Sequence, residues 1–393
     1  MAAGVSEYIE RVETDGGEVE SDIYVSESVE DLGDFFDDAS LVNIPTAYKA
    51  TKLYSIKPTD GSGDFTFARS TTATRVNESG LIESVGVNVP RIDYSSGTPA
   101  LLLEPQRTNL MTNSEDASGF YGGATITNDF TQINPAGLYS SVKMSNLQAV
   151  TGDRVGFLTS NITAGNTYTA SVYIKGTAGE TTNYQFKRIG GTYAGTPVTP
   201  ITFDGTWQKI EATFTTLPDN TGVTFQIVNT TSVTADVIYL WGGQIEEGSY
   251  ATSYIPTSGT AVTRTIDAIT NNVSYALSTG YTIFIELQTQ SLTVSNDIEF
   301  KDASSNYVFR VGDEVIVGAG LFTQANTTGF NKFALQVDAA GNYELFKNGS
   351  SVTSGSGIAH DIEVISSVAG QDVRQMIVFE QALTDAECIT LTT

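Results

Sequence analysis

Residues 168–176 read YTASVYIKG, and this segment decides the fold class of the chain. Its apolar residues Tyr168, Ala170, Val172 and Ile174 alternate with other residues, which predicts a β-strand with one buried face. The period returns in segments separated by Gly, Asn and Pro: GTWQKIEATFTT (205–216), VTFQIV (223–228) and DVIYLWGGQ (236–244). Spaced strands of this kind predict a β-sandwich over residues 116–262.

The last of these segments places Val237, Tyr239 and Trp241 on one face, so we expect Trp241 to be a core residue. Trp207 also lies within an alternating segment. Both tryptophans are therefore expected to pack in the protein and not to be presented to a ligand.

A second β-sandwich is predicted over residues 263–393. In YTIFIELQ (281–288), Tyr281, Ile283, Ile285 and Leu287 share one face. Asn348-Gly349 is a tight-turn signal between two extended runs. Near the end, ALTDAECITLT (382–392) predicts a short helix, with Thr384 as its N-cap and Glu387 at the capping-box position.

Residues 1–45 have a different character, because they hold 13 acidic side chains against one basic residue, Arg11. Val5, Tyr8, Ile9 and Val12 have helical spacing, and Ser28 with Asp31 has the spacing of a capping box. We expect a short acidic, partly helical arm. It cannot bury enough surface alone, so it packs either on the same chain, on a sister subunit or on another protein.

Residues 46–115 predict an extended, irregular segment, because Gly and Pro interrupt it repeatedly. Such a segment is stable only if it lies across another domain. Its four arginines, Arg69, Arg75, Arg91 and Arg107, fit either a basic ligand surface or local pairing with carboxylates and backbone carbonyls. We favour local pairing, since irregular buried backbone needs extra donors.

The composition excludes several classes of protein. The 393 residues carry a formal net charge of −25, which argues against binding nucleic acid. No apolar run approaches the roughly 20 residues of a membrane span, so no membrane insertion is expected. The N-terminus lacks the apolar core of a secretion signal. We therefore expect release by lysis or inside a particle.

The residues of nucleophilic or metal catalysis are scarce, and we expect no enzyme. His360 is the only histidine and has no nucleophile-elbow serine near it in sequence. Cys388 is the only cysteine, which excludes an intrachain disulfide, and it is expected to be a packing residue. The pair Glu246-Glu247 leaves a polysaccharide depolymerase open as an alternative.

No cofactor is expected, although a structural calcium ion remains open. Aspartates at predicted strand ends or turns could supply its oxygen ligands: Asp204, Asp219, Asp236, Asp302 and Asp313. Without the spacing of a known calcium loop, no ligands are assigned.

Carbohydrate binding requires exposed aromatic rings that stack on sugar faces. The candidates are loop aromatics with glycine neighbours: Phe120 and Tyr121 in SGFYGG, and Tyr193 in GGTYAG. The alternative is that each ring packs on its own sandwich.

Several segments together resemble bacteriophage virion proteins of the head-fibre, tail-fibre and baseplate type. The matching segments are FARSTTATRVNESG (67–80), NVPRIDY (88–94), LLLEPQRTNLMTNSE (101–115) and YATSYIPTSG followed by VTRTID (250–267). In that family such segments accompany a jelly roll similar to carbohydrate-binding modules. The last third of the chain is similar to laminin-G or concanavalin-A-like sandwiches.

This resemblance implies a structural protein on the virion surface, anchored to the capsid or tail through residues 1–45. It implies a homotrimer that displays its sandwiches for weak, multivalent adhesion to host glycans. The alternatives are a capsid or tail decoration protein without a ligand, and the depolymerase named above.

Overall fold

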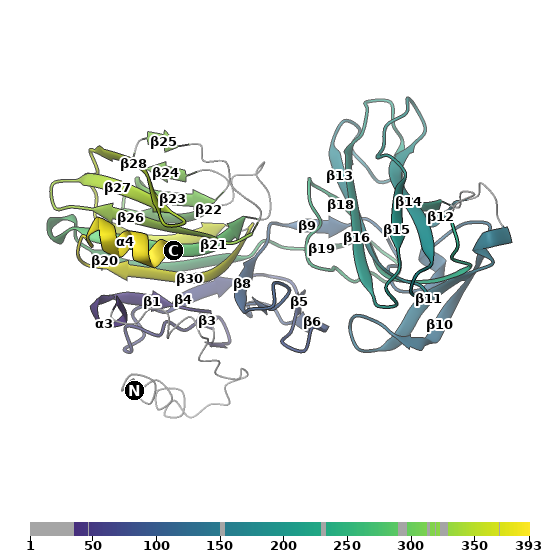
Figure 1. Cartoon of the computed structure of the whole chain (residues 1–393), viewed down its shortest axis with the longest axis horizontal. Helices are drawn as coiled ribbons and strands as arrows, with labels where there is room; N and C mark the ends of the chain where they lie inside the picture. Colours follow the sequence, from purple (N-terminus) through teal and green to yellow (C-terminus); the bar gives the residue numbers. More distant parts are fainter. Residues whose placement is uncertain are drawn as a thin grey trace. The chain divides into compact units, whose positions relative to one another are not determined.

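The computed structural model describes residues 35–45, 47–149, 154–228, 233–289, 297–312, 315–318, 320–322, 329–368 and 370–393. Within these residues the protein is mainly β, and its strands form antiparallel sheets with hydrophobic cores between them (Figure 1). The predicted fold class is therefore confirmed. In the part of the chain that the structure describes, no helix is long and apolar enough to span a membrane.

The chain divides into two compact units that are each assembled from separate segments. Unit 1 comprises residues 1–72, 85–105 and 265–393, and unit 2 comprises residues 73–84 and 106–264. The predicted domain boundaries at 45, 115 and 262 divide the chain into consecutive domains. In the structure the chain instead passes between the two units four times.

Unit 2 is a sandwich of two antiparallel sheets. The five-stranded sheet has the order β10 (Thr125–Ile133), β11 (Tyr139–Ser145), β18 (Val237–Glu247), β13 (Thr167–Lys175) and β16 (Gln208–Thr215). The four-stranded sheet has the order β12 (Arg154–Thr159), β17 (Gly222–Val228), β14 (Thr181–Ile189) and β15 (Thr199–Thr202). The remaining elements are β5 (Ala73–Val76) with β6 (Ile82–Val85), β9 (Arg107–Asn109) with β19 (Val262–Arg264), and the 3-10 turns η1 (Ala117–Gly119) and η2 (Leu147–Ala149).

The core of unit 2 follows the predicted alternation in most strands. Tyr168, Ala170, Val172 and Ile174 of β13 are all buried in it. In β18 the predicted face is wrong, because Ile238 and Leu240 enter this core instead. The other face of β18 carries Trp241, which is buried in a separate cluster.

That separate cluster explains why both tryptophans are covered. Trp241 is 2% exposed and packs with Ile82 and Tyr254, and the partly buried Trp207 joins them. The indole of Trp207 donates a hydrogen bond to the carbonyl oxygen of Ile133 at 2.7 Å. The prediction that the tryptophans pack in the protein is confirmed, although they do so outside the main core.

Unit 1 is also built from two antiparallel sheets. The first has the order β28 (Ser350–Ser356), β27 (Asn342–Lys347), β26 (Asn331–Val337), β21 (Tyr281–Thr289), β30 (Gln371–Phe379), β8 (Ala100–Leu103) and β7 (Ile92–Asp93), with β1 (Leu41–Asn43) also paired to β30. The second has the order β2 (Tyr48–Lys49), β3 (Lys52–Leu53), β4 (Phe65–Ala68), β20 (Ala268–Tyr275), β29 (Ile362–Val368), β22 (Asp297–Lys301), β23 (Tyr307–Gly312), β24 (Val315–Val317) and β25 (Gly320–Phe322). The 3-10 turn η3 (Leu277–Thr279) precedes β21.

The local signals of the last third are confirmed. Tyr281, Ile283, Ile285 and Leu287 are at most 1% exposed in one core. Asn348 and Gly349 have φ values of 47° and 78° between β27 and β28, as a tight hairpin turn requires. Helix α4 (Asp385–Thr392) has the full capping box, with hydrogen bonds in both directions between Thr384 and Glu387.

The arm is described only at its end. Helix α3 (Phe35–Asp38) and β1 belong to unit 1, where Phe35 and Phe36 pack on the cluster that contains Cys388. The predicted helical stripe at 5–12 and the capping box at Ser28 lie outside the described residues.

The segment 46–115 is more ordered than predicted. It supplies short strands to both units, including β8, which pairs with β30, and β9, which pairs with β19. These strands escape a reading of the local sequence because their partners lie more than a hundred residues away.

Candidate functional site

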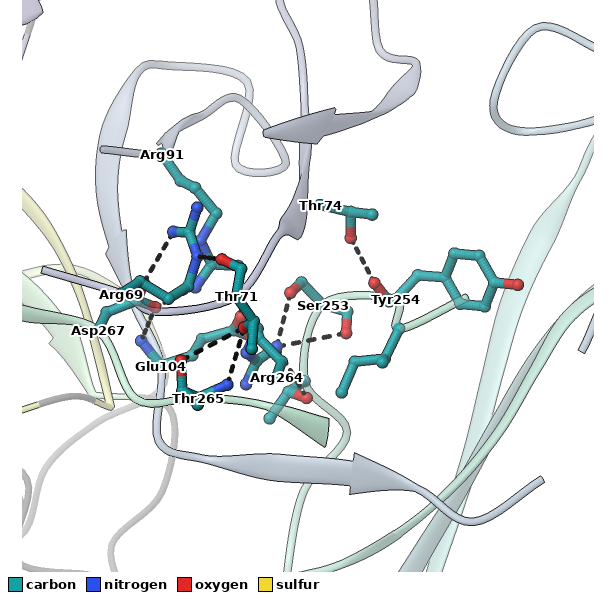
Figure 2. Close-up of polar contacts among 12 residues, drawn as sticks. Arg69, Thr71, Thr74, Arg91, Glu104, Ser253, Tyr254, Arg264, Thr265 and Asp267 are labelled. Carbon is teal, nitrogen blue, oxygen red and sulfur yellow. Dashed lines mark hydrogen bonds and ion pairs between the residues drawn. The ribbon is translucent and has the colours of Figure 1, made fainter. Parts of the chain in front are cut away.

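The arginines of residues 46–115 have partners within the protein. In unit 1, Arg69 and Arg91 converge on the carboxylate of Asp267, with Glu104 beside them (Figure 2). Arg69 Nη1 lies 3.0 Å from Asp267 Oδ1, and Arg91 Nη1 lies 2.6 Å from Glu104 Oε2. All four side chains are at most 2% exposed. This buried ion cluster leaves no free basic surface for a ligand.

Burial by itself lowers the pKa of Arg91, but Asp267 and Glu104 outweigh it, so the net shift of its pKa is upward. The guanidinium therefore stays charged, and two charges of each sign balance inside unit 1. Because one partner comes from 69, one from 91, one from 104 and one from 267, the cluster joins four distant parts of the sequence.

The other two arginines of the segment also have partners, within unit 2. Arg75 Nε lies 2.7 Å from Glu83 Oε1, and the guanidinium of Arg107 lies 5.3 Å from the centre of the Tyr250 ring. The four arginines therefore pair within the protein, as expected, but only Arg75 and Arg91 have a carboxylate partner nearby in sequence, whereas Arg69 pairs with the distant Asp267.

The catalytic candidates that the structure describes have partners within the protein or are buried. Glu246 is buried and accepts a hydrogen bond from the Thr252 amide at 3.0 Å. Burial raises the pKa of Glu246 despite bonds from Thr252 and the nearby Arg264. His360 Nδ1 lies 2.9 Å from Asp302 Oδ2. Cys388 is buried, and burial raises the pKa of its thiol to about 12.

The aspartates considered for calcium occupy separate turns. Asp204 accepts bonds from Thr206 and Asp219 from Thr192, and these bonds lower the pKa of each carboxyl. Asp236 accepts from the Gln148 amide, and Asp302 accepts from Asn306. Asp313 lies outside the described residues. The described carboxylates, with His and Cys, form no group of three that could hold a metal ion, and calcium stays a prediction.

Phe120 is removed from the sugar-stacking candidates by its burial. It is 7% exposed, belongs to the core of unit 2 and meets Phe157 edge to face, with ring centroids 5.7 Å apart. The glycine neighbours therefore do not leave the Phe120 ring exposed. Tyr121, the next residue, pairs with Gly156 of β12, and Phe120 points into the core.

Tyr121 lies at the edge of the four-stranded sheet. Its backbone exchanges two hydrogen bonds with Gly156 of β12, at 2.8 and 2.9 Å. Its hydroxyl lies 2.6 Å from Thr224 Oγ1 and accepts a hydrogen bond from Gln226 Nε2 at 2.7 Å. The side chain therefore crosses β12 and reaches β17. A Cβ at Gly156 would lie 1.9 Å from the carbonyl oxygen of Phe225, so this close strand pairing requires glycine.

Tyr193 contacts the same sheet at β14, whereas Tyr121 contacts it at β12. It is 57% exposed, and its hydroxyl accepts a hydrogen bond from Gln185 Nε2 at 2.7 Å. Gly195 pairs with Lys187 of β14. Since Gln185 and Lys187 are two residues apart in β14 and share a face, the bond to Gln185 places Tyr193 on the side of Lys187.

These residues define one surface, which we call the amide face. Val223, Phe225 and Ile227 of β17 point into the core, so Gln226 points outward, and Phe186 likewise fixes Gln185 as outward. Gln185 and Gln226 are direct partners in the β14–β17 register. The amide face comprises Tyr121, Gln185, Lys187, Tyr193 and Gln226.

A polar atom on this face lacks a partner. Gln226 is 6% exposed, and its Oε1 has no hydrogen-bond partner, while its Nε2 is held by Tyr121. Buried acceptors are normally satisfied, so such an atom calls for a donor. The glutamines were not predicted, because in sequence they are merely the polar positions of alternating strands. Only the register brings them together.

Residues 119–234 match the sequence model of a carbohydrate binding domain family. The match covers less than half of the chain and includes all five residues of the amide face. It is a match to a binding domain, not to a catalytic one. A search of curated proteins finds no match.

Solved structures give weaker likenesses. The xylan-binding CBM22-1 domain from Paenibacillus barcinonensis is 14% identical, with a TM-score of 0.27, over 37% of this chain and 94% of that domain. A Clostridium thermocellum endo-1,4-beta-D-xylanase fragment is 14% identical, with a TM-score of 0.29, and 30% of its length is covered. Tailspike protein 4 of bacteriophage CBA120 is 13% identical, with a TM-score of 0.27, and 21% of its length is covered. Scores this low do not establish a shared fold.

Proposed function

We propose that unit 2 is a glycan-binding module and that its ligand lies on the amide face. The observation that carries this proposal is the pairing of an exposed Tyr193 ring with a row of amides, inside the residues that match a carbohydrate binding domain. Aromatic rings offer an apolar face to a sugar, and amides offer both donors and acceptors to its hydroxyls.

The amides also hold the tyrosines in place. Each glutamine donates from Nε2 to one tyrosine hydroxyl, at 2.7 Å in both cases. Tyr121 and Tyr193 are therefore fixed before a ligand arrives, which lowers the entropy lost on binding. A sugar hydroxyl would supply the donor that Gln226 Oε1 lacks.

The test is glycan binding by the full chain and by Tyr193→Ala, measured on immobilised polysaccharides. We expect Tyr193→Ala to weaken binding roughly tenfold, equivalent to about 1.4 kcal/mol. Tyr139→Ala is the matched control, because Tyr139 is 60% exposed on the other sheet. Loss of binding in the control with full binding in Tyr193→Ala would place the ligand elsewhere.

We further propose that the chain is a structural component on the surface of a bacteriophage virion, as a homotrimer anchored through residues 1–45. The resemblance of the segments at 67–80, 88–94 and 101–115 to phage fibre and baseplate proteins supports this proposal. Weak glycan sites suit such a particle, because many copies facing one host surface act together.

Immunogold labelling of intact virions with an antibody against residues 263–393 tests this location, and light scattering of the purified chain tests the trimer. Unlabelled particles would contradict it. Particles that lose stability without the protein, combined with no glycan binding, would favour the decoration role. Release of reducing sugar would favour the depolymerase.

A further inference from the structure

The acidic charge of the chain is concentrated in unit 1. Of the 45 acidic side chains, 32 belong to the residues of unit 1, together with 11 of the 20 basic ones. Unit 2 carries 13 acidic and 9 basic residues, and it is therefore close to neutral. The net charge of −25 thus does not by itself exclude an acidic ligand from unit 2.

Lys187 stands on the amide face without a counterion. It is half-buried, lies opposite Thr224 in the β14–β17 register, and has no ion pair among the described residues. By contrast, Arg75, Lys301, Arg310 and Arg374 each pair with a carboxylate.

The surroundings of Lys187 supply no carboxylate. Among the described side chains, the outward positions of β12, β17, β14 and β15 are filled by glycine, apolar residues, hydroxyls, amides and Lys187 itself. In the loops, Asp219 is bonded to the amide and hydroxyl of Thr192, at 2.7 and 2.6 Å, and it interacts electrostatically with Arg188.

A second cation lies beside the exposed ring. The guanidinium of Arg188 is 5.7 Å from the centre of the Tyr193 ring. The amide face therefore combines the aromatic ring of Tyr193, the ammonium of Lys187 and the unsatisfied oxygen of Gln226, which is more than nine-tenths buried.

We infer that the ligand of the amide face is an anionic glycan, whose acidic group is bound by Lys187 while a sugar ring lies against Tyr193. This inference rests on the proposed function and narrows its ligand. A lysine without an ion pair gains a charge-assisted hydrogen bond from an anionic oxygen of a ligand. Gln226 Oε1 accepts from a hydroxyl of the same ligand.

The test compares polygalacturonate, alginate, hyaluronan and dextran sulfate with the carboxyl-reduced forms of the first three and with dextran. Binding of the full chain, Lys187→Gln, Lys187→Arg and Lys143→Gln is measured at low and high salt. Lys143 is the control, because it is a half-buried lysine of β11 in the other sheet. Dextran sulfate distinguishes a sulfate ligand from a carboxylate.

We expect at least one acidic polymer to bind roughly tenfold more tightly than its neutral form, and Lys187→Gln to remove that preference. Lys187→Arg and Lys143→Gln should keep it, and salt should weaken it. Equal binding to acidic and neutral forms, or an unchanged preference in Lys187→Gln, overturns the inference and leaves glycan binding intact. Absence of binding to every polymer overturns both.

Discussion

A buried arginine is stable only where its charge is balanced, and Arg91 shows how this chain achieves that. Its side chain is fully buried between Glu104 and Asp267, and Arg69 supplies the second positive charge. Removing one member of such a cluster costs far more than the ion pair is worth, because the remaining charges stay buried without compensation.

We predict that Arg91→Met destabilises unit 1 by about 3–5 kcal/mol, because Glu104 and Asp267 lose their shared cation. Arg75→Met removes the partly exposed pair with Glu83 and should cost at most about 1 kcal/mol. Urea unfolding of both variants checks the difference. Equal effects would mean that the cluster contributes no more than a surface pair.

Glu246 gives a prediction about pH. Its folded pKa is raised by burial, so the protonated form is favoured in the folded state, and stability is lost as the pH rises through the folded pKa. Glu246→Gln cannot ionise. We expect the stability of this variant relative to the wild type to increase from pH 4 to pH 8. Thermal unfolding across that range measures it, and a constant difference would contradict the shift.

For single residues, the sequence predicted the chemical type of the arginines' partners, carboxylates and carbonyls, but not which residues they are. Local pairing was expected, but Asp267 lies almost two hundred residues from Arg69, and no local pattern specifies such a partner. The same limit applies to the amide face. Tyr121 and Tyr193 are visible as loop aromatics, whereas Gln185 and Gln226 become neighbours only through the strand register.

Among the elements, helix α4 depends on its cap. Thr384 and Glu387 satisfy each other's backbone donors at the start of the helix, whose buried side chains include Cys388 and Leu391. We predict that Thr384→Ala destabilises unit 1 by about 1 kcal/mol.

Thr390→Ala is the matched control in the same helix, because Thr390 is exposed. Its hydroxyl donates a hydrogen bond to the carbonyl oxygen of Ala386, and its own carbonyl oxygen accepts one from the amide of Thr393. It should be neutral or stabilising, since alanine favours a helix. Urea midpoints compare the two variants. An unchanged midpoint in Thr384→Ala would show that tertiary packing alone fixes the helix.

Elements with regular alternation were predicted well, and irregular ones were not. The strand at 281–289 and the capped helix are encoded by residues close together in sequence. In β18, by contrast, the core face cannot be chosen from alternation, because both faces are covered and Gly242 adopts a φ of +66° within the strand. Likewise, β8 and β9 have partners that lie far away in sequence, β30 and β19, which no local pattern specifies.

For the whole molecule, two separate cores and an uneven charge predict two unfolding transitions. Screening of like charges should raise the midpoint of unit 1 more than that of unit 2, because unit 1 holds most of the acidic excess. Calorimetry at 10 and 300 mM salt measures this, and Arg91→Met identifies the transition of unit 1. A single transition that shifts uniformly would contradict the division.

Because the chain passes back and forth between the two units, the order of synthesis on the ribosome determines which unit can fold first. All strands of unit 2 have been made once residue 264 has emerged, whereas β30, which pairs with β21, β8 and β1, follows about a hundred residues later. We expect unit 2 to fold on the nascent chain while the early segments of unit 1 wait. During that interval the strands of unit 1 at 41–68 and 92–103 are exposed, and chaperones would act on them.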